Sequence, residues 1–236
     1  MNVSVVVPVY NEETTIAEVL DSLAPLDLYE VIVVDDGSSD GTAALVEEHV
    51  SKPILLRQPA NRGKGAAIRR GLQAARGDVL VIQDADLELS PTMIKKLVEP
   101  IAAGNADAVY GSRFLEGAER VPRVRRAANR FLTRLTNVLY GTELTDMETA
   151  HKAFRAPLLA GLDLRSNRFE IEAELTIKLA RSGAVFAEIA SPYHPRLRSE
   201  GKKIRWHDAL TAAATLLRYY RWRSSGSPSD GHSSAS

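Results

Sequence analysis

Residues 78–88, DVLVIQDADLE, decide the fold class of this 236-residue chain. Residues 79–82 form an unbroken apolar run, which is typical of a strand buried on both faces of a parallel sheet. Three acids follow at every second position: Asp84, Asp86 and Glu88. If the backbone stays extended beyond the strand, their side chains project to one side and share a small volume. Ligands of open α/β sheets bind at the carboxyl ends of strands, so this stretch also predicts where the site lies.

Three carboxylates in one small volume repel one another, which raises their pKa values unless a cation lies among them. Oxygen atoms without nitrogen or sulfur ligands are the coordination set that Mg²⁺ or Mn²⁺ prefers. The sequence therefore predicts a divalent metal held by Asp84, Asp86 and Glu88. The alternative is a solvated acidic loop, which the position at a strand end disfavours.

The same pattern recurs on both sides of this segment. We expect further apolar strands at about 3–7, 31–34, 54–56 and 108–110, with helices at about 12–23, 42–50 and 91–102. A turn at 61–65 is expected to lead into another helix, which ends near position 76. Pro8 is expected to end the first strand, and Gly77 is a candidate residue just after the third helix. Strands that alternate with helices predict an α/β fold, a doubly wound, mostly parallel sheet flanked by helices.

The second half contains two helices that mix apolar residues with arginines, and between them a helix at about 169–179 and a strand at about 185–189. The first basic helix, at about 123–140, has the apolar stripe Val124, Ala128, Phe131, Leu135 and Val138. Its arginines form either a solvated face or an anion-binding or membrane-surface face. The last helix, at about 207–222, has the stripe Trp206, Leu210, Ala213, Leu217 and Tyr220, and it either packs on the domain or lies on a membrane.

Composition excludes several classes of protein. Charged residues make up 25% of the chain and hydrophobic residues 44%, which is ordinary for a soluble globular protein. Basic and acidic residues both number 30, so we expect no nucleic-acid partner. The absence of cysteine excludes disulfides and thiolate chemistry, and we expect neither a signal peptide nor a membrane-spanning helix. We expect a catalytic domain over 1–205, an amphipathic helix over 206–223 and a disordered tail over 224–236.

Common nucleotide-binding and nucleophile motifs are missing. A dinucleotide fold needs G-x-G-x-x-G after its first strand, where this chain reads PVYNEE at 8–13. A P-loop needs a glycine at position 58 and Ser or Thr after Lys64, and the chain has neither. There is also no G-x-S-x-G nucleophile turn.

The motifs that are present resemble the inverting family 2 glycosyltransferases of GT-A fold, the nucleotide-diphospho-sugar transferase fold. They are VVPVYNEE at 6–13, VDDGSSDGT at 34–42, NRGKG at 61–65, QDADLE at 83–88 and GSR at 111–113. More narrowly, they resemble the dolichyl-phosphate mannose synthase and polyprenyl-phosphate glucosyltransferase branch. The resemblance covers roughly residues 3–205.

This resemblance implies the roles of individual residues. Pro8, Tyr10, Glu12 and Asp36 would hold the base and ribose, with Lys64, Asp84 and Ala85 near the nucleotide. Asp86, the second acid of the DxD motif, would bind the metal, while Glu88 stands where several relatives have Gln. Asp84, Asp86 and Arg113 would be the catalytic residues. The acceptor phosphate would be held by Arg113, Arg125 or Arg126, Arg198, Lys202 and Lys203.

The expected reaction moves a hexose from a GDP- or UDP-sugar to a polyprenyl phosphate. The metal would stabilise the departing diphosphate, and an acceptor phosphate, already anionic, needs cations and no base. We expect a cytoplasmic enzyme, peripheral at the membrane surface, with a second copy or a separate membrane-anchoring protein as further partner. One alternative is a soluble or glycan hydroxyl acceptor, with Glu170, Glu172 or Asp146 as base. Another is a non-catalytic nucleotide-sugar-binding or membrane-scaffold module.

Overall fold

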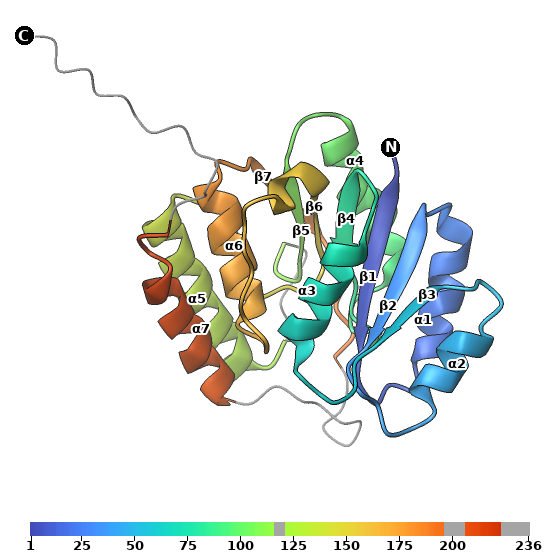
Figure 1. Cartoon of the computed structure of the whole chain (residues 1–236). Coiled ribbons are helices and arrows are strands. Elements are labelled where there is room, and N and C mark those ends of the chain that lie inside the picture. The colour runs from blue at the N-terminus through green and yellow to red at the C-terminus, as the bar shows by residue number, and fades with distance from the viewer. Residues whose placement is uncertain (116–120, 196–205, 223–236) are drawn as a thin grey trace, which may run out of the picture.

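The computed structural model describes residues 1–115, 121–195 and 206–222. Of residues 206–209 it describes the backbone only. Its centre is a seven-stranded sheet of order β3-β2-β1-β4-β6-β5-β7 (Figure 1). The strands are β1 Val3–Val9, β2 Glu30–Asp35, β3 Ile54–Arg57, β4 Val79–Ile82, β5 Ala108–Ser112, β6 Lys152–Arg155 and β7 Phe186–Ala190. The helices are α1 Ile16–Leu23, α2 Thr42–Glu48, α3 Lys64–Ala74, α4 Ile94–Ala102, α5 Arg123–Tyr140, α6 Ile171–Arg181 and α7 Trp206–Arg218. Short 3₁₀ turns are η1 Ala24–Leu26, η2 Pro91–Met93 and η3 Ala156–Leu159.

The predicted doubly wound, mostly parallel sheet is confirmed, and it contains one strand that the sequence did not predict. β6 runs antiparallel to both of its neighbours, with Lys152 opposite Ile82 of β4 and Tyr110 of β5. The other pairings of the sheet are parallel. β6 was missed because it has only four residues, begins with a lysine and ends with an arginine, and so shows no apolar run.

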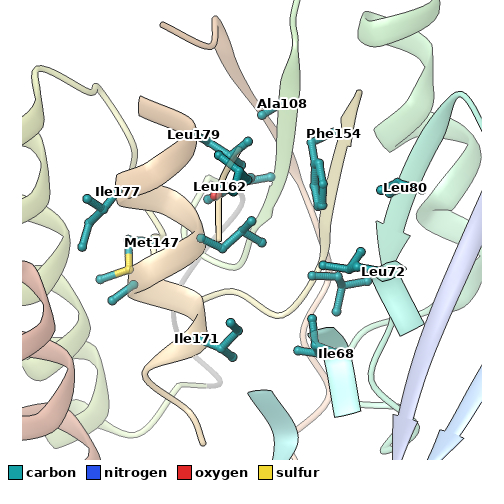
Figure 2. Packing of buried hydrophobic residues seen from close by; sticks show 14 of the residues in the cluster. Ile68, Leu72, Leu80, Ala108, Met147, Phe154, Leu162, Ile171, Ile177 and Leu179 are labelled. Carbon is teal, nitrogen blue, oxygen red and sulfur yellow. The ribbon is translucent and has the colours of Figure 1, made fainter. Parts of the chain in front are cut away.

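Alternate residues of the strands supply two separate cores. Val6 and Leu80 face the layer that contains α3, α5, α6 and α7, while Val5 and Val81 face the layer that contains α1 and α4. Figure 2 shows Phe154 of β6 in the first layer, with Leu72 of α3 among the side chains of the same cluster. Burial on both faces explains why these strands read as continuous apolar runs.

Pro8 does not end the first strand, and that prediction is wrong. β1 continues to Val9, still paired with β2, whereas β4 pairs with β1 only as far as Val6. The backbone carbonyl of Val6 points toward β4 and accepts a hydrogen bond from the N–H of Gln83. Pro8 lies two residues further along, so its missing N–H would face the same side, where β4 has already ended.

The apolar stripe predicted for α5 largely faces outward. The exposed fractions of Val124, Phe131 and Val138 are 82%, 64% and 82%. The buried side of α5 is Asn129, Leu132, Thr133 and Thr136. Asn129 and Thr133 are satisfied there by hydrogen bonds, so polar residues can face the interior.

α7 repeats this arrangement next to α5 and α6 (Figure 1). Leu210 and Leu217 of the predicted stripe are 61% and 65% exposed, and Leu216 on the opposite side is buried. The helix ends at Arg218, before the predicted end at position 222. Of the helices in the described parts of the chain, none is both long and apolar enough to span a membrane.

Two helix ends differ from the prediction for local reasons. α1 begins at Ile16, because residues 12–15 form a turn in which the Glu12 carbonyl accepts from the N–H groups of Thr15 and Ile16. α3 ends at Ala74 and is capped by extended Ala75, so Gly77 does not close it. Gly77 instead lies where a Cβ atom would come within 2.6 Å of the Ser4 hydroxyl.

The outward stripe of α5 makes a stability prediction with a built-in control. Leu132→Ala should lower the free energy of unfolding by about 2–5 kcal/mol, because it opens a cavity. Phe131→Ala removes a larger side chain from the preceding position. It should change the free energy of unfolding by less than about 0.5 kcal/mol, because the Phe131 ring is exposed. Urea denaturation of the two variants measures both. A Phe131→Ala loss as large as that of Leu132→Ala would contradict the assignment of the faces.

Candidate active site

The carboxyl ends of four strands bring the predicted site residues to one edge of the sheet. Tyr10 follows β1, Asp36 follows β2, Asp84 follows β4 and Arg113 follows β5. Because β6 runs in the opposite direction, it begins at this edge. The segment 146–151 that leads into β6 therefore lies between the ends of β4 and β5.

The DxD segment is a turn, so the prediction of an extended backbone is wrong. Residues 85–88 turn, Leu87 has a left-handed φ of 57°, and the N–H of Glu88 donates to Asp86 Oδ1 at 3.0 Å. Glu88 Oε2 accepts from the Tyr193 hydroxyl at 3.0 Å. The three acids are consequently not aligned in one row.

Lys64 joins the DxD segment to α6. Its Nζ lies 2.8 Å from Asp84 Oδ2 and 3.1 Å from Glu172 Oε1. Burial alone would lower the pKa of the Lys64 ammonium, but the two carboxylates outweigh it and raise the pKa above its ordinary value. Lys64 is therefore a fixed cation at the sheet edge, and Asp84 already has a counter-ion.

Glu172, one of the candidate bases, is the centre of a buried charged cluster. Besides Lys64 it binds Lys152, whose Nζ also donates to the Thr149 carbonyl. Burial raises the pKa of Glu172, but the two lysines reverse this and lower it. A carboxylate with a depressed pKa and two bound ammonium groups is a poor general base.

The loop that carries Lys64 is held from two sides. The Asp36 carboxylate accepts from the side chain of Gln58 at 2.7 Å and from the N–H groups of Arg62 and Gly63 at 2.8 and 2.7 Å. On the opposite side, a Cβ at Gly63, whose φ is +100°, would come within 2.4 Å of the Asn167 carbonyl oxygen. Asp36 thus anchors the loop, and its predicted contact with base or ribose stays a prediction.

The other residues implied to bind base and ribose lie on two interlocked loops after β1 and β2. Glu12 is buried, its N–H donates to Thr42 Oγ1 at 2.8 Å, and its Oε2 accepts from Thr15. Asn11 Oδ1 accepts from the N–H of Ser39 at 2.9 Å. Pro8 and Tyr10 are partly buried beside these loops, and their contact with a nucleotide stays a prediction.

Arg113 is oriented by a two-pronged contact with Asp146. Its Nε and a terminal nitrogen donate to the two carboxylate oxygens at 2.6 and 2.7 Å, and its backbone N–H adds a third bond at 3.0 Å. Burial raises the pKa of Asp146, but Arg113 and Asn129 lower it below its usual range. Asp146 is therefore also a poor candidate base, which weakens the hydroxyl-acceptor alternative.

The remaining predicted phosphate ligands divide into two groups. Arg125 and Arg126 are partly buried on the first turn of α5, and the charge of Arg125 acts on the Tyr193 hydroxyl. The ring centroid of Tyr193 lies 5.5 Å from the guanidinium carbon of Arg113, and its hydroxyl donates to Glu88. Tyr193 therefore links Arg113 to the DxD turn, a role that the sequence did not predict. Arg198, Lys202 and Lys203 lie outside the described residues, as does the tail from position 224.

Glu148 is a second site residue that the sequence did not reveal. It is partly exposed, but its Oε1 is buried and has no hydrogen-bond partner among the described residues. Burial raises the pKa of Glu148 to about 7, because repulsion from Glu172 and Asp146 counteracts the attraction of Lys152 and Arg113. Glu148 precedes an unpredicted strand in a segment without periodicity, so no sequence signal identified it.

The acids of the DxD turn fit a divalent cation bound together with a nucleotide. Burial and then repulsion from Asp84 and Glu88 raise the pKa of Asp86 to about 7, although the charge of Lys64 opposes this, and a divalent cation would relieve the repulsion among the acids. Within residues 1–115, 121–195 and 206–222, no group of three or more His, Cys, Asp or Glu could hold a metal by itself. Mg²⁺ is commonly held by one or two carboxylates together with substrate phosphates. The turn would supply the carboxylates, and a bound nucleotide would supply the phosphates.

A seven-stranded mixed sheet flanked by helices, with a DxD turn at its carboxyl edge, is the GT-A fold of glycosyltransferases. Comparison with known proteins identifies the family. Residues 4–162 match the model of glycosyl transferase family 2. The chain belongs to this family, and it is a glycosyltransferase.

Two relatives have names that refer to dolichol phosphate or dolichyl phosphate. The dolichyl-phosphate hexose transferase of Haloferax volcanii is 32% identical over 196 residues, covering 83% of this chain and 84% of the relative. The dolichol-phosphate mannosyltransferase of Pyrococcus furiosus is 33% identical over 212 residues, covering 86% of this chain but 59% of the relative. A third relative, glycosyltransferase AglD of H. volcanii, is 32% identical, and the match spans 37% of its length.

Solved structures confirm the fold. Glucosyl-3-phosphoglycerate synthase from Mycobacterium tuberculosis in complex with UDP has a TM-score of 0.75 and 27% identity, covering 95% of this chain and 82% of that one. The complex of the same enzyme with Mn²⁺, UDP-glucose and phosphoglyceric acid has a TM-score of 0.71. The sequence relatives support the predicted dolichyl-phosphate mannose synthase-like branch, and the structural neighbours were solved with UDP or UDP-glucose.

The buried cluster predicts a specific cost of removing one charge. Glu172→Gln should lower the free energy of unfolding by about 3–5 kcal/mol, because Lys64 and Lys152 then lose their shared counter-ion. Glu170→Gln, two residues earlier, should change it by less than about 0.5 kcal/mol. Denaturant titration at pH 7 compares the two, and equal losses would show that the cluster does not stabilise the fold.

Replacing Glu148 should have the opposite effect on stability from replacing Glu172, and the size of this effect should depend on pH. A carboxyl whose pKa rises from 4.5 to about 7 on folding binds its proton more tightly when folded, so ionisation costs stability as pH rises through this window. Glu148→Gln should therefore stabilise the protein at pH 8 by up to about 3 kcal/mol and leave it nearly unchanged at pH 4. Thermal unfolding at both pH values tests this. A variant less stable than wild type at pH 8 would contradict it.

Proposed function

We propose that the chain transfers a hexose from a GDP- or UDP-sugar to a polyprenyl phosphate, with inversion at the anomeric carbon. The observation that carries this proposal is the site itself, where fixed cations and acids meet at one sheet edge and two candidate bases are already paired. Lys64 lies on the DxD side and Arg113 on the opposite side. The names of two relatives, which act on dolichyl or dolichol phosphate, support the acceptor.

The chemistry of the acceptor agrees with these charges. A phosphate monoester is already anionic near neutral pH, so it can attack the anomeric carbon without losing a proton to the protein. It needs cations for binding, and Arg113, with Arg125 or Arg126, would supply them. A new bond forms between a phosphate oxygen and C1, while the C1–oxygen bond to the nucleoside diphosphate breaks and the diphosphate leaves with the electron pair.

The donor side must stabilise the charge of this leaving group. Lys64 is oriented by Asp84 and Glu172 and would contact the diphosphate from a fixed position, which avoids reorganisation during the reaction. Asp86, with Asp84 or Glu88, would hold Mg²⁺ or Mn²⁺, and such a cation neutralises the negative charge that develops on the diphosphate. The Mn²⁺ complexes of the solved neighbours support this assignment.

Peripheral binding to the cytoplasmic face of a membrane would give the enzyme access to a lipid acceptor. The outward residues of α5 and α7 support this, because Phe131, Val138 and Leu217 are exposed on helices that also carry arginines. Apolar side chains next to arginines are the pattern of helices that lie at a headgroup layer. A second copy or a membrane-anchoring protein is a further proposed partner for this surface.

A soluble phosphorylated acceptor is the second candidate. It is favoured by the solved neighbours, which are named for the glucosylation of 3-phosphoglycerate and were crystallised with phosphoglyceric acid. The same arginines could bind the phosphate of either acceptor. The two functions differ in the attacking atom, which is a phosphate oxygen in the first case and a hydroxyl oxygen in the second.

Product analysis distinguishes the two functions. The protein is incubated with Mn²⁺, UDP-glucose or GDP-mannose, and either a short polyprenyl phosphate or phosphoglyceric acid, and the products are identified by mass spectrometry. We expect a hexosyl polyprenyl phosphate, and at least about 100-fold slower formation by Asp86→Ala. Glu99→Gln, an exposed acid on α4, is the matched control and should retain full activity. Transfer to phosphoglyceric acid alone would refute the lipid acceptor.

A further inference from the structure

Glu148 has an unusual position among the acids at this edge of the sheet. The hydroxyl of the next residue, Thr149, donates to the Gly111 carbonyl of β5 at 2.7 Å. The Thr149 carbonyl in turn accepts from Lys152. The segment that carries Glu148 thus lies at the sheet edge between the ends of β4 and β5. The charges of Arg113 and Asp146, and those of Lys152 and Glu172, all act on its carboxyl.

The cations near Glu148 are already bound to other acids. Arg113 uses its side chain on both oxygens of Asp146, and Lys152 binds Glu172 and a backbone carbonyl. The Oε1 atom of Glu148 is buried and has no hydrogen-bond partner in the part of the chain that is described. Buried acceptors are normally hydrogen-bonded, and one that is not has a cost that calls for an explanation by a ligand.

The chemistry of the site narrows the identity of this ligand. An acceptor phosphate would be repelled by a carboxylate, so Glu148 does not suit that half of the reaction. A hexose carries several neutral hydroxyl groups, each of which can donate a hydrogen bond to a carboxylate oxygen. The transferred sugar must also lie between the leaving diphosphate and the attacking acceptor, and Glu148 interacts with charges of both proposed sides, Arg113 on one and the Lys152–Glu172 pair on the other.

We propose that Glu148 is a donor-specificity residue, whose carboxylate accepts a hydrogen bond from a hydroxyl of the hexose in the bound nucleotide sugar. This inference rests on the proposed nucleotide-sugar donor and does not depend on the identity of the acceptor. The raised pKa of Glu148 agrees with it, because burial that destabilises a side chain in the free protein is a common property of binding sites. It also agrees with the stability that we expect Glu148→Gln to gain.

The test isolates the sugar from the nucleotide. Isothermal titration in Mn²⁺ gives the dissociation constants of UDP and UDP-glucose, or of GDP and GDP-mannose, whichever pair binds the wild type. The ratio of the two constants measures the contribution of the sugar. Glu148→Ala should weaken binding of the nucleotide sugar by about 10- to 100-fold and change the ratio by the same factor. The affinity for the free nucleotide should stay unchanged. Glu148→Gln should shift it less in the same direction, because an amide oxygen still accepts.

Two controls make the outcome decisive. Glu143→Gln, an exposed acid between α5 and β6, should leave the ratio at the wild-type value. In a series of UDP-deoxyglucoses, the one that lacks the contacted hydroxyl should bind wild type more weakly than UDP-glucose and bind Glu148→Ala no more weakly. Thermal unfolding confirms that each variant is folded.

An unchanged ratio in folded Glu148→Ala would overturn the inference. If turnover were lost at the same time, Glu148 would act on the acceptor, as a base for a hydroxyl group. A wild-type protein that bound neither nucleotide pair would refute the proposed function itself, which is a different result from a failure confined to Glu148.

Discussion

The site depends on one partly buried ionic contact, that of Lys64 with the two carboxylates Asp84 and Glu172. It connects the end of β4, the start of α3 and the first turn of α6, which are far apart in the sequence. A lysine buried without counter-ions would lose its charge, and carboxylates buried without cations would take up protons. The three groups thus keep one another ionised at a place where binding of a diphosphate requires a stable positive charge. Lys152 extends this arrangement to β6.

The sequence predicted the sheet well because its strands are buried on both faces. Residues 79–82 and 31–34 show this directly, as continuous apolar runs that end in acids. Since the carboxyl ends of parallel strands meet at one edge, the position of Asp36, Asp84 and Arg113 near one another also followed. β6 did not follow, because it is short, polar at both ends and antiparallel, and Glu148 and Lys152 at its start were missed with it.

The faces of α5 show where periodicity becomes ambiguous. A helical repeat of apolar residues fixes which residues share a face, but it does not say whether that face meets the protein or something else. Phe131 lies on the apolar stripe and is exposed, whereas Asn129 and Thr133 are buried because Asp146 and Met147 satisfy them. The same limit applies to Glu172, because its position in the first turn of a helix does not reveal its two lysine partners.

The close approach of two loops has a dynamic consequence. Gly65 leaves so little space that a Cβ there would come within 2.5 Å of the Ser166 carbonyl oxygen, and the N–H of Ala66 donates to the Asn167 carbonyl at 3.1 Å. One loop cannot be displaced without losing its contact with the other. Amide protons of the two segments are therefore expected to exchange with deuterium at matched rates, as one cooperative opening unit that links the start of α3 to the segment before α6.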